Sequence, residues 1–233
     1  MFNRTLFIVL LVLAATFSVR AGDVQGTIVI QRKLTKRKVT PSPSLYERGM
    51  AVELATDQDK DPLAFERTHV VIYLEGDSPS TEITAEMNQQ NRRFSPDLVV
   101  IPAGSAVSFP NLDPIFHNVF SLSKTKSFDL GNYPKDHSRT VKFAKPGIVF
   151  VNCHLHPNMS AVIVVTPNRW STKADATGHF TLSGVPPGAY TITAWHKSAG
   201  FFKKPITVGE DGNASVEFAI PLNDDAFVQQ ARK

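Results

Sequence analysis

Short runs of β-branched and aromatic residues, separated by glycine, proline and asparagine turns, recur along almost the whole chain of 233 residues. Runs of this length and spacing are typical of strands that bury one face against a second sheet. The expected strands span residues 26–30, 70–74, 98–101, 106–109, 118–122, 140–143, 147–152, 161–165, 180–182, 189–195, 206–208 and 214–220. Only the tail after Asn223 has any helical pattern, so the sequence predicts an all-β protein.

These strands fall into two groups. A central module covers residues 77–167, and the strands after it are too few for an independent sandwich. Two early strands are not needed by the central module, so we predict a discontinuous small β-sandwich from residues 22–76 and 168–221. Residues 222–233 form a tail. The alternative is two sequential domains with an N-terminal arm.

A long polar stretch at residues 35–67 separates the first two expected strands. A loop of this length is either functional or mobile, and we expect a mobile one. The basic run at residues 32–38 is expected to be a solvated face. The formal net charge of the whole chain is +4, which is too weak to indicate a nucleic-acid partner.

The first 21 residues have the features of a secretory signal peptide. Arg4 precedes an apolar run at residues 6–17, and cleavage is expected near Ala21. The run is shorter than the roughly 20 residues that a membrane span requires, and no later stretch could span. The sequence therefore predicts a mature protein without a membrane span, in the periplasm or secreted.

Cys153 is the only cysteine in the chain, so an internal disulfide is excluded. His156 and Met159 follow it at the spacing Cys-x2-His-x2-Met, and His117 can supply a second imidazole. A thiolate and two imidazoles in a trigonal plane, with a weak axial thioether, suit a blue-copper site. The alternative is a buried structural cysteine.

The region that carries these residues resembles a known family. The segments Val100-Ile101-Pro102-Ala103-Gly104, Phe109-Pro110-Asn111-Leu112-Asp113, His117-Asn118-Val119 and Lys145-Pro146-Gly147, followed by the Cys153, His156 and Met159 loop, resemble the cupredoxins, in particular plastocyanin and amicyanin. The resemblance implies a Greek-key β-sandwich with one type 1 copper, which has His117, Cys153 and His156 as equatorial ligands and Met159 as axial ligand. It also implies that Asn118 braces the cysteine loop by hydrogen bonds.

The family resemblance implies an electron carrier that exchanges single electrons with a periplasmic partner, such as a cytochrome or a dehydrogenase-like protein, as in methylamine utilization. The C-terminal segments Gly178-His179-Phe180-Thr181-Leu182 and Val185-Pro186-Pro187-Gly188-Ala189-Tyr190 resemble carboxypeptidase regulatory-like domains, which are transthyretin-like β-sandwiches. That second resemblance implies a fold and no reaction.

His154 directly follows the cysteine, and alternation along a strand end predicts that it points away from the Cys153 side chain. We expect a surface histidine, with an extra metal ligand as the alternative. Apart from His154-Leu155-His156, the additional His-x-His pairs of a second copper site are missing from the sequence, as are nucleophile-elbow and P-loop motifs. These absences favour a protein that is not an enzyme, and make a copper oxidase or nitrite reductase unexpected.

Three functions are thus distinguished by the sequence. The favoured one is a mononuclear blue-copper electron carrier. The second is a periplasmic protein for copper binding and delivery, and the third is a cell-envelope module, carbohydrate-binding-like, in which copper is accessory.

Overall fold

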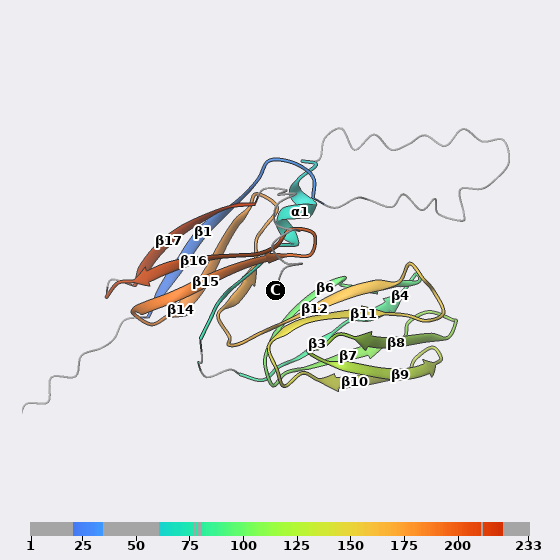
Figure 1. Cartoon of the computed structure of the whole chain (residues 1–233). Helices are drawn as coiled ribbons and strands as arrows, with labels where there is room; N and C mark the ends of the chain where they lie inside the picture. The colour runs from blue at the N-terminus through green and yellow to red at the C-terminus, as the bar shows by residue number, and fades with distance from the viewer. Residues whose placement is uncertain (1–20, 35–60, 77, 79–80, 211, 221–233) are drawn as a thin grey trace, which may run out of the picture.

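The computed structural model describes residues 21–34, 61–76, 78, 81–210 and 212–220, and it confirms the all-β fold class (Figure 1). The proposed signal peptide, most of the 35–67 stretch, and the tail after Asn223 lie outside the described residues. Within the described part of the chain, no helix is long and apolar enough to cross a membrane. The strands form two groups of sheets, which Figure 1 shows as an upper and a lower body.

The lower body contains the predicted central module. Its five-stranded sheet has the order β6 (Leu98–Pro102), β12 (Ser160–Thr166), β11 (Gly147–Asn152), β8 (His117–Leu122) and β9 (Ser127–Tyr133). The facing three-stranded sheet has the order β10 (Ser138–Lys142), β7 (Ala106–Pro110) and β3 (Thr84–Glu86). A small hairpin, β4 (Asn88–Gln90) and β5 (Arg93–Ser95), completes it. These sheets are consistent with a cupredoxin-like β-sandwich.

The core of this sandwich follows from the two-residue period of its strands. Val107 and Phe109 on β7 are fully buried, as are Val149 and Val151 on β11, while the residues between them are more exposed. Side chains two apart in a strand share a face, so each strand contributes one row of apolar side chains to the space between the sheets. Burying each side chain of this size stabilises the fold by about 1.5–3 kcal/mol.

The upper body joins strands from both ends of the described chain. One sheet has the order β14 (His179–Val185), β1 (Gly22–Ile30) and β17 (Asn213–Ile220), and the other has the order β13 (Ser171–Lys173), β2 (Val71–Leu74), β15 (Gly188–His196) and β16 (Gly200–Val208). Early strands lie between late strands in both sheets, around one shared core. The domain boundaries 22–76, 77–167 and 168–221 remain a prediction.

Gly26 shows how tightly β1 is held between its neighbours. It pairs with Phe180 on β14 and with Val216 on β17. A Cβ at Gly26 would lie 2.2 Å from the Val216 carbonyl oxygen and 2.4 Å from the Phe180 ring. Any side chain at this position would therefore push the three strands apart.

The two bodies contact each other through a small apolar cluster. Trp195 on β15 and Val71 on β2 pack against side chains of the five-stranded sheet, namely Leu98, Val162 and Val164. His69, at the end of the short helix α1 (Ala64–Thr68), also forms an ion pair with Asp97 across the same contact, at 3.2 Å. The upper body thus covers the β6 and β12 part of the outer sheet face.

Several elements were not predicted from the sequence. Residues 127–133 form β9 although they contain Gly131 at φ +66°. The short strands β3, β4, β5 and β13 were also missed. The predicted 35–67 loop is wrong in its last part, because α1 begins there at Ala64. A helix of five residues is too short to give a helical period in the sequence.

Next to α1, a buried Glu66–His196 pair gives the upper body a testable pH dependence. The His196 Nε2 lies 3.3 Å from Glu66 Oε2, its Nδ1 accepts the Ser198 N–H, and both side chains are at most 1% exposed. Burial lowers the pKa of His196 to about 4, although the Glu66 carboxylate opposes this shift. The unfolded chain therefore binds more protons than the folded chain below a pH of about 6.5.

We expect the metal-free protein to lose about 3 kcal/mol of unfolding free energy through His196 as the pH falls from about 6.5 to about 4. Above the unfolded pKa this contribution is fully present. Urea denaturation across this pH range measures the loss, and His196→Gln, which keeps a neutral donor, is the control. An unchanged pH dependence in His196→Gln would contradict the prediction.

Candidate metal centre

Three of the proposed ligands follow β11 on one short turn. Cys153 comes directly after the last residue of β11, and Met159 directly precedes β12. The Cys153 N–H donates to the Met159 carbonyl at 3.2 Å, and the Met159 N–H donates to the His156 carbonyl at 2.9 Å. These bonds close the turn and hold Cys153 and His156 together at one end of the sandwich.

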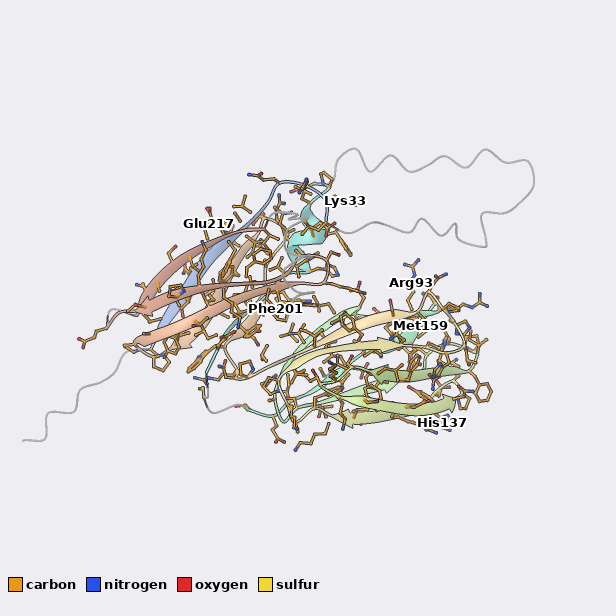
Figure 2. The ribbon with its side chains drawn as sticks, viewed as in Figure 1. Lys33, Arg93, His137, Met159, Phe201 and Glu217 are labelled. Atoms are coloured by element: carbon orange, nitrogen blue, oxygen red, sulfur yellow. The ribbon has the colours of Figure 1, made fainter. Side chains whose placement is uncertain are left out.

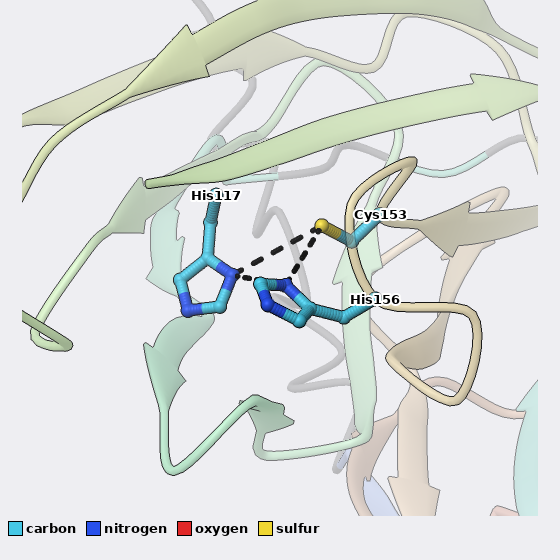
Figure 3. Close-up of side chains that lie close together, drawn as sticks. All are labelled: His117, Cys153 and His156. Atoms are coloured by element: carbon cyan, nitrogen blue, oxygen red, sulfur yellow. Dashed lines mark hydrogen bonds between the residues drawn. The ribbon is translucent and has the colours of Figure 1, made fainter. Parts of the chain in front are cut away.

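His117 reaches the same place from a neighbouring strand. It is the first residue of β8, which pairs with β11 through Phe120 and Asn152. This pairing places the start of β8 beside the end of β11, and Figure 3 shows the His117 ring facing Cys153 and His156. His117 is 0% exposed and Cys153 is 5% exposed, while His156 is half-buried.

The donor atoms of these three residues converge. The two Nδ1 atoms lie 3.1 Å apart, and Cys153 Sγ lies 3.8 Å from His156 Nδ1 and 4.0 Å from His117 Nδ1. The point equidistant from the three atoms lies about 2.1 Å from each, within the range of about 2.0–2.3 Å at which imidazole and thiolate bind metal ions. The described residues contain no other such group of three.

The orientation of His117 is set by Asp113. The Nε2 of His117 lies 2.7 Å from Asp113 Oδ2, so that this nitrogen donates and Nδ1 faces the centre. The carboxylate also accepts the N–H groups of Asn91 and Arg92. Burial alone would raise the pKa of Asp113, but the donors from Arg92, His117 and Asn91 outweigh burial and lower it.

Asn118 connects β8 to the cysteine loop by two hydrogen bonds and to β9 by a third. Its backbone N–H donates to Cys153 Sγ at 3.5 Å, and its side-chain oxygen accepts the His154 N–H at 3.4 Å. Its side-chain nitrogen donates to Asp129 at 2.7 Å. Asn118 is buried, so these contacts can brace the loop in the way that the resemblance implies.

His154 and Met159 are the two remaining candidate ligands on this loop. The His154 ring stacks on Phe120 with centroids 3.7 Å apart, and its Nε2 lies 3.6 Å from Asp129, so the ring lies outside the cluster. Met159 is 1% exposed in the core of the lower body, where Figure 2 labels it. Its role as axial ligand stays a prediction, as does an extra-ligand role for His154.

His156 is suited to keep a free ring nitrogen near neutral pH. Burial lowers its pKa, and the neighbouring His117 and Arg92 lower it further, while Asp113 opposes the shift. A neutral imidazole is the form that binds a metal ion.

Asp113 is the residue of this centre to which sequence reasoning assigned no role. A signal was present, because an acidic residue four positions before a candidate histidine ligand is a candidate partner for its second ring nitrogen. The spacing alone does not show that the carboxylate faces the ring, since that depends on how residues 111–117 turn between β7 and β8.

No family model and no curated protein matches this chain. Similar solved structures include amicyanin from Paracoccus versutus, with 21% identity and a TM-score of 0.33, covering 40% of this chain and 96% of amicyanin. They also include a purple cupredoxin from Nitrosopumilus maritimus, with 21% identity and a TM-score of 0.32, covering 35% of this chain and 99% of that protein.

A third similar structure is the copper-containing nitrite reductase from Thermus scotoductus SA-01, with 21% identity and a TM-score of 0.34. The match covers 40% of this chain and 25% of the reductase, so this chain spans a quarter of that protein's length. The prediction that the chain is not an enzyme, and that a nitrite reductase is unexpected, is contradicted by this neighbour, and we withdraw it.

Proposed function

We propose that this chain is an exported mononuclear copper protein that carries single electrons. The observation that carries the proposal is the convergence of Cys153 Sγ with the Nδ1 atoms of His117 and His156 on one point. A thiolate with two imidazoles is a donor set that suits copper. Bound copper would supply a one-electron couple at this point, and the chain would hold one copper through His117, Cys153 and His156, with Met159 as a fourth ligand.

The surroundings of the donors favour electron transfer over copper delivery. An electron carrier works fastest when its ligands move little between the two oxidation states of the metal. Asp113 already orients His117, Asn118 already binds the cysteine sulfur, and the loop is closed by backbone hydrogen bonds. A delivery protein requires ligands that release the metal readily, and this array is instead held from several sides.

The surface around His156 offers a place for a redox partner. Phe116 is 56% exposed, Leu155 is 45% exposed and Leu112 is 41% exposed. The first two are direct or near neighbours in sequence of His117 and His156. We propose that a periplasmic protein, of the cytochrome or dehydrogenase-like kind, docks here and exchanges its electron through the half-buried His156 ring.

The upper body is proposed to be the discontinuous domain of residues 22–76 and 168–221, of the carboxypeptidase regulatory-like kind. Support comes from the sheets that join early and late strands, and from the Trp195 cluster that attaches this body to the five-stranded sheet of the lower body. In this proposal the upper body holds the lower body in place near its partner, and the chain beginning near Gly22 is the periplasmic form.

The proposal is tested by titrating the protein that begins at Gly22 with copper(II) while recording visible absorption and EPR spectra. We expect one copper per chain, an intense thiolate-to-copper band and a reversible one-electron couple. His137→Gln, at an exposed loop histidine, controls for incidental copper binding. Binding of copper without the thiolate band, or loading without a reversible couple, would contradict an electron-carrier function.

A further inference from the structure

Asp113 is not one of the three converging donors, but its carboxylate is held in a defined position beside them. Its side chain is 10% exposed, yet both carboxylate oxygens are used. Oδ1 accepts the Asn91 N–H at 2.7 Å, and Oδ2 accepts the Arg92 N–H at 2.8 Å as well as the His117 Nε2–H at 2.7 Å. Three donors on one buried carboxylate give it a single position and a lasting negative charge.

The two backbone donors come from the tip of the β4–β5 hairpin. Asn91 and Arg92 have φ values of +55° and +54°, the left-handed region that two-residue hairpin turns of this kind require. Arginine rarely adopts that region because its Cβ crowds the following carbonyl oxygen, so the turn holds Arg92 in a disfavoured conformation. In this conformation both N–H groups of the turn point at the same carboxylate, so the hairpin tip forms a cradle for Asp113.

The backbone of Asp113 is held by a separate set of hydrogen bonds. Its own N–H donates to Asn111 Oδ1 at 3.0 Å, and the Asn111 side chain donates in turn to the Ile115 and Tyr133 carbonyls. Asn111 is 0% exposed. The loop between β7 and β8 is thereby tied to the end of β9 on one side and to the hairpin tip on the other, with Asp113 at the junction.

We infer that Asp113, cradled by the Asn91–Arg92 turn, is the positioning residue that aims His117 Nδ1 at the metal centre and makes this imidazole the more electron-rich ligand. The inference rests on the proposed copper function. A carboxylate behind an imidazole fixes the ring tautomer and raises its basicity, which favours the more highly charged copper(II) over copper(I). Asp113 acts on the centre through His117, whose Nε2 lies 2.7 Å from Asp113 Oδ2.

Asp113→Asn keeps the shape of the side chain and removes its charge, and Asp113→Ala removes all three acceptor contacts. We expect Asp113→Asn to weaken copper(II) binding about 10-fold and Asp113→Ala up to about 100-fold. Copper(I) binding should change less, so the reduction potential rises. A tenfold change in the ratio of the two affinities corresponds to about 59 mV. Glu86→Gln, which removes one charge from an exposed position on β3, is the matched control.

A measurement without copper separates this inference from the proposed function. Long-range proton–nitrogen NMR spectra of the metal-free protein should show His117 as a single Nε2–H tautomer, and Asp113→Ala should show a mixture. An unchanged tautomer in Asp113→Ala, or unchanged copper(II) affinity and potential in a folded Asp113→Asn, would overturn the inference. A fixed tautomer in a wild-type protein that binds no copper would support the positioning role while removing the copper function.

Discussion

Replacing Cys153 with serine is expected to abolish the intense visible absorption of the copper-loaded protein. That band requires a thiolate bonded to copper, and a serine hydroxyl keeps its proton near neutral pH and is a poor copper ligand. Only His117 and His156 then remain of the three donors. Losing a residue that merely hydrogen-bonds to a metal ligand weakens binding by up to roughly 100-fold, so losing a ligand should weaken copper(II) binding by at least that factor. Isothermal titration with copper(II) and the visible spectrum of the loaded variant measure both effects.

The fold of this variant must be shown to be intact. Cys153 is 5% exposed and accepts the Asn118 N–H, and a serine oxygen can accept the same donor. The metal-free Cys153→Ser protein should therefore unfold within a few degrees of the wild type in a thermal melt monitored by circular dichroism. A variant that is folded and still gives the band would exclude Cys153 as the thiolate ligand.

Replacing Trp195 with alanine is expected to cost about 3–5 kcal/mol of unfolding free energy and to uncouple the two bodies. Trp195 is 4% exposed and packs in the cluster that joins β15 to the five-stranded sheet. Its removal leaves Leu98, Val162 and Val164 facing a cavity or water. Calorimetry should show one unfolding transition in the wild type and two separated transitions in the variant, while the thiolate–copper band is retained.

Phe201→Ala is the matched control for the tryptophan. Phe201 lies beside Trp195, with ring centroids 6.3 Å apart, but it is 45% exposed. Because folding buries far less of its apolar area, its truncation should cost about 1 kcal/mol and leave a single transition. If Trp195→Ala unfolds as the wild type does, the apolar cluster contributes little to the joining of the two bodies.

The predictions from sequence agree best with the structure where the residues of a segment themselves determine its secondary structure. Residues 147–152 and 214–220 were predicted as strands, and they are β11 and most of β17. The first is rich in β-branched and aromatic residues, and in the second Val216, Phe218 and Ile220 recur with a period of two. Residues 127–133 were missed although Phe128, Leu130 and Tyr133 lie there, because Gly131 and Asn132 interrupt the run. Pairing with β8 supplies the hydrogen bonds that hold this segment in the sheet.

Part of the metal centre is likewise determined by local sequence, and part depends on long-range strand pairing. The spacing of Cys153, His156 and Met159 on one short loop is a local property, and it was sufficient to propose a copper site and its loop. The approach of His117 to that loop depends on the pairing of β8 with β11, two strands separated by 24 residues or more in the chain. Such long-range pairing is decided by the whole sheet, and a motif search can only suggest it.

The residues themselves were enough to predict an all-β chain, the donor types of the centre and a cysteine that forms no internal disulfide, because these depend on composition and on spacing over a few positions. Tertiary structure decided how those donors converge and which residues hold them in position. The Asp113 carboxylate reaches His117 only because a hairpin turn from β4 and β5 holds it. Trp195 joins the two bodies only because β15 lies against the outer sheet, an arrangement that results from burying apolar area between distant segments.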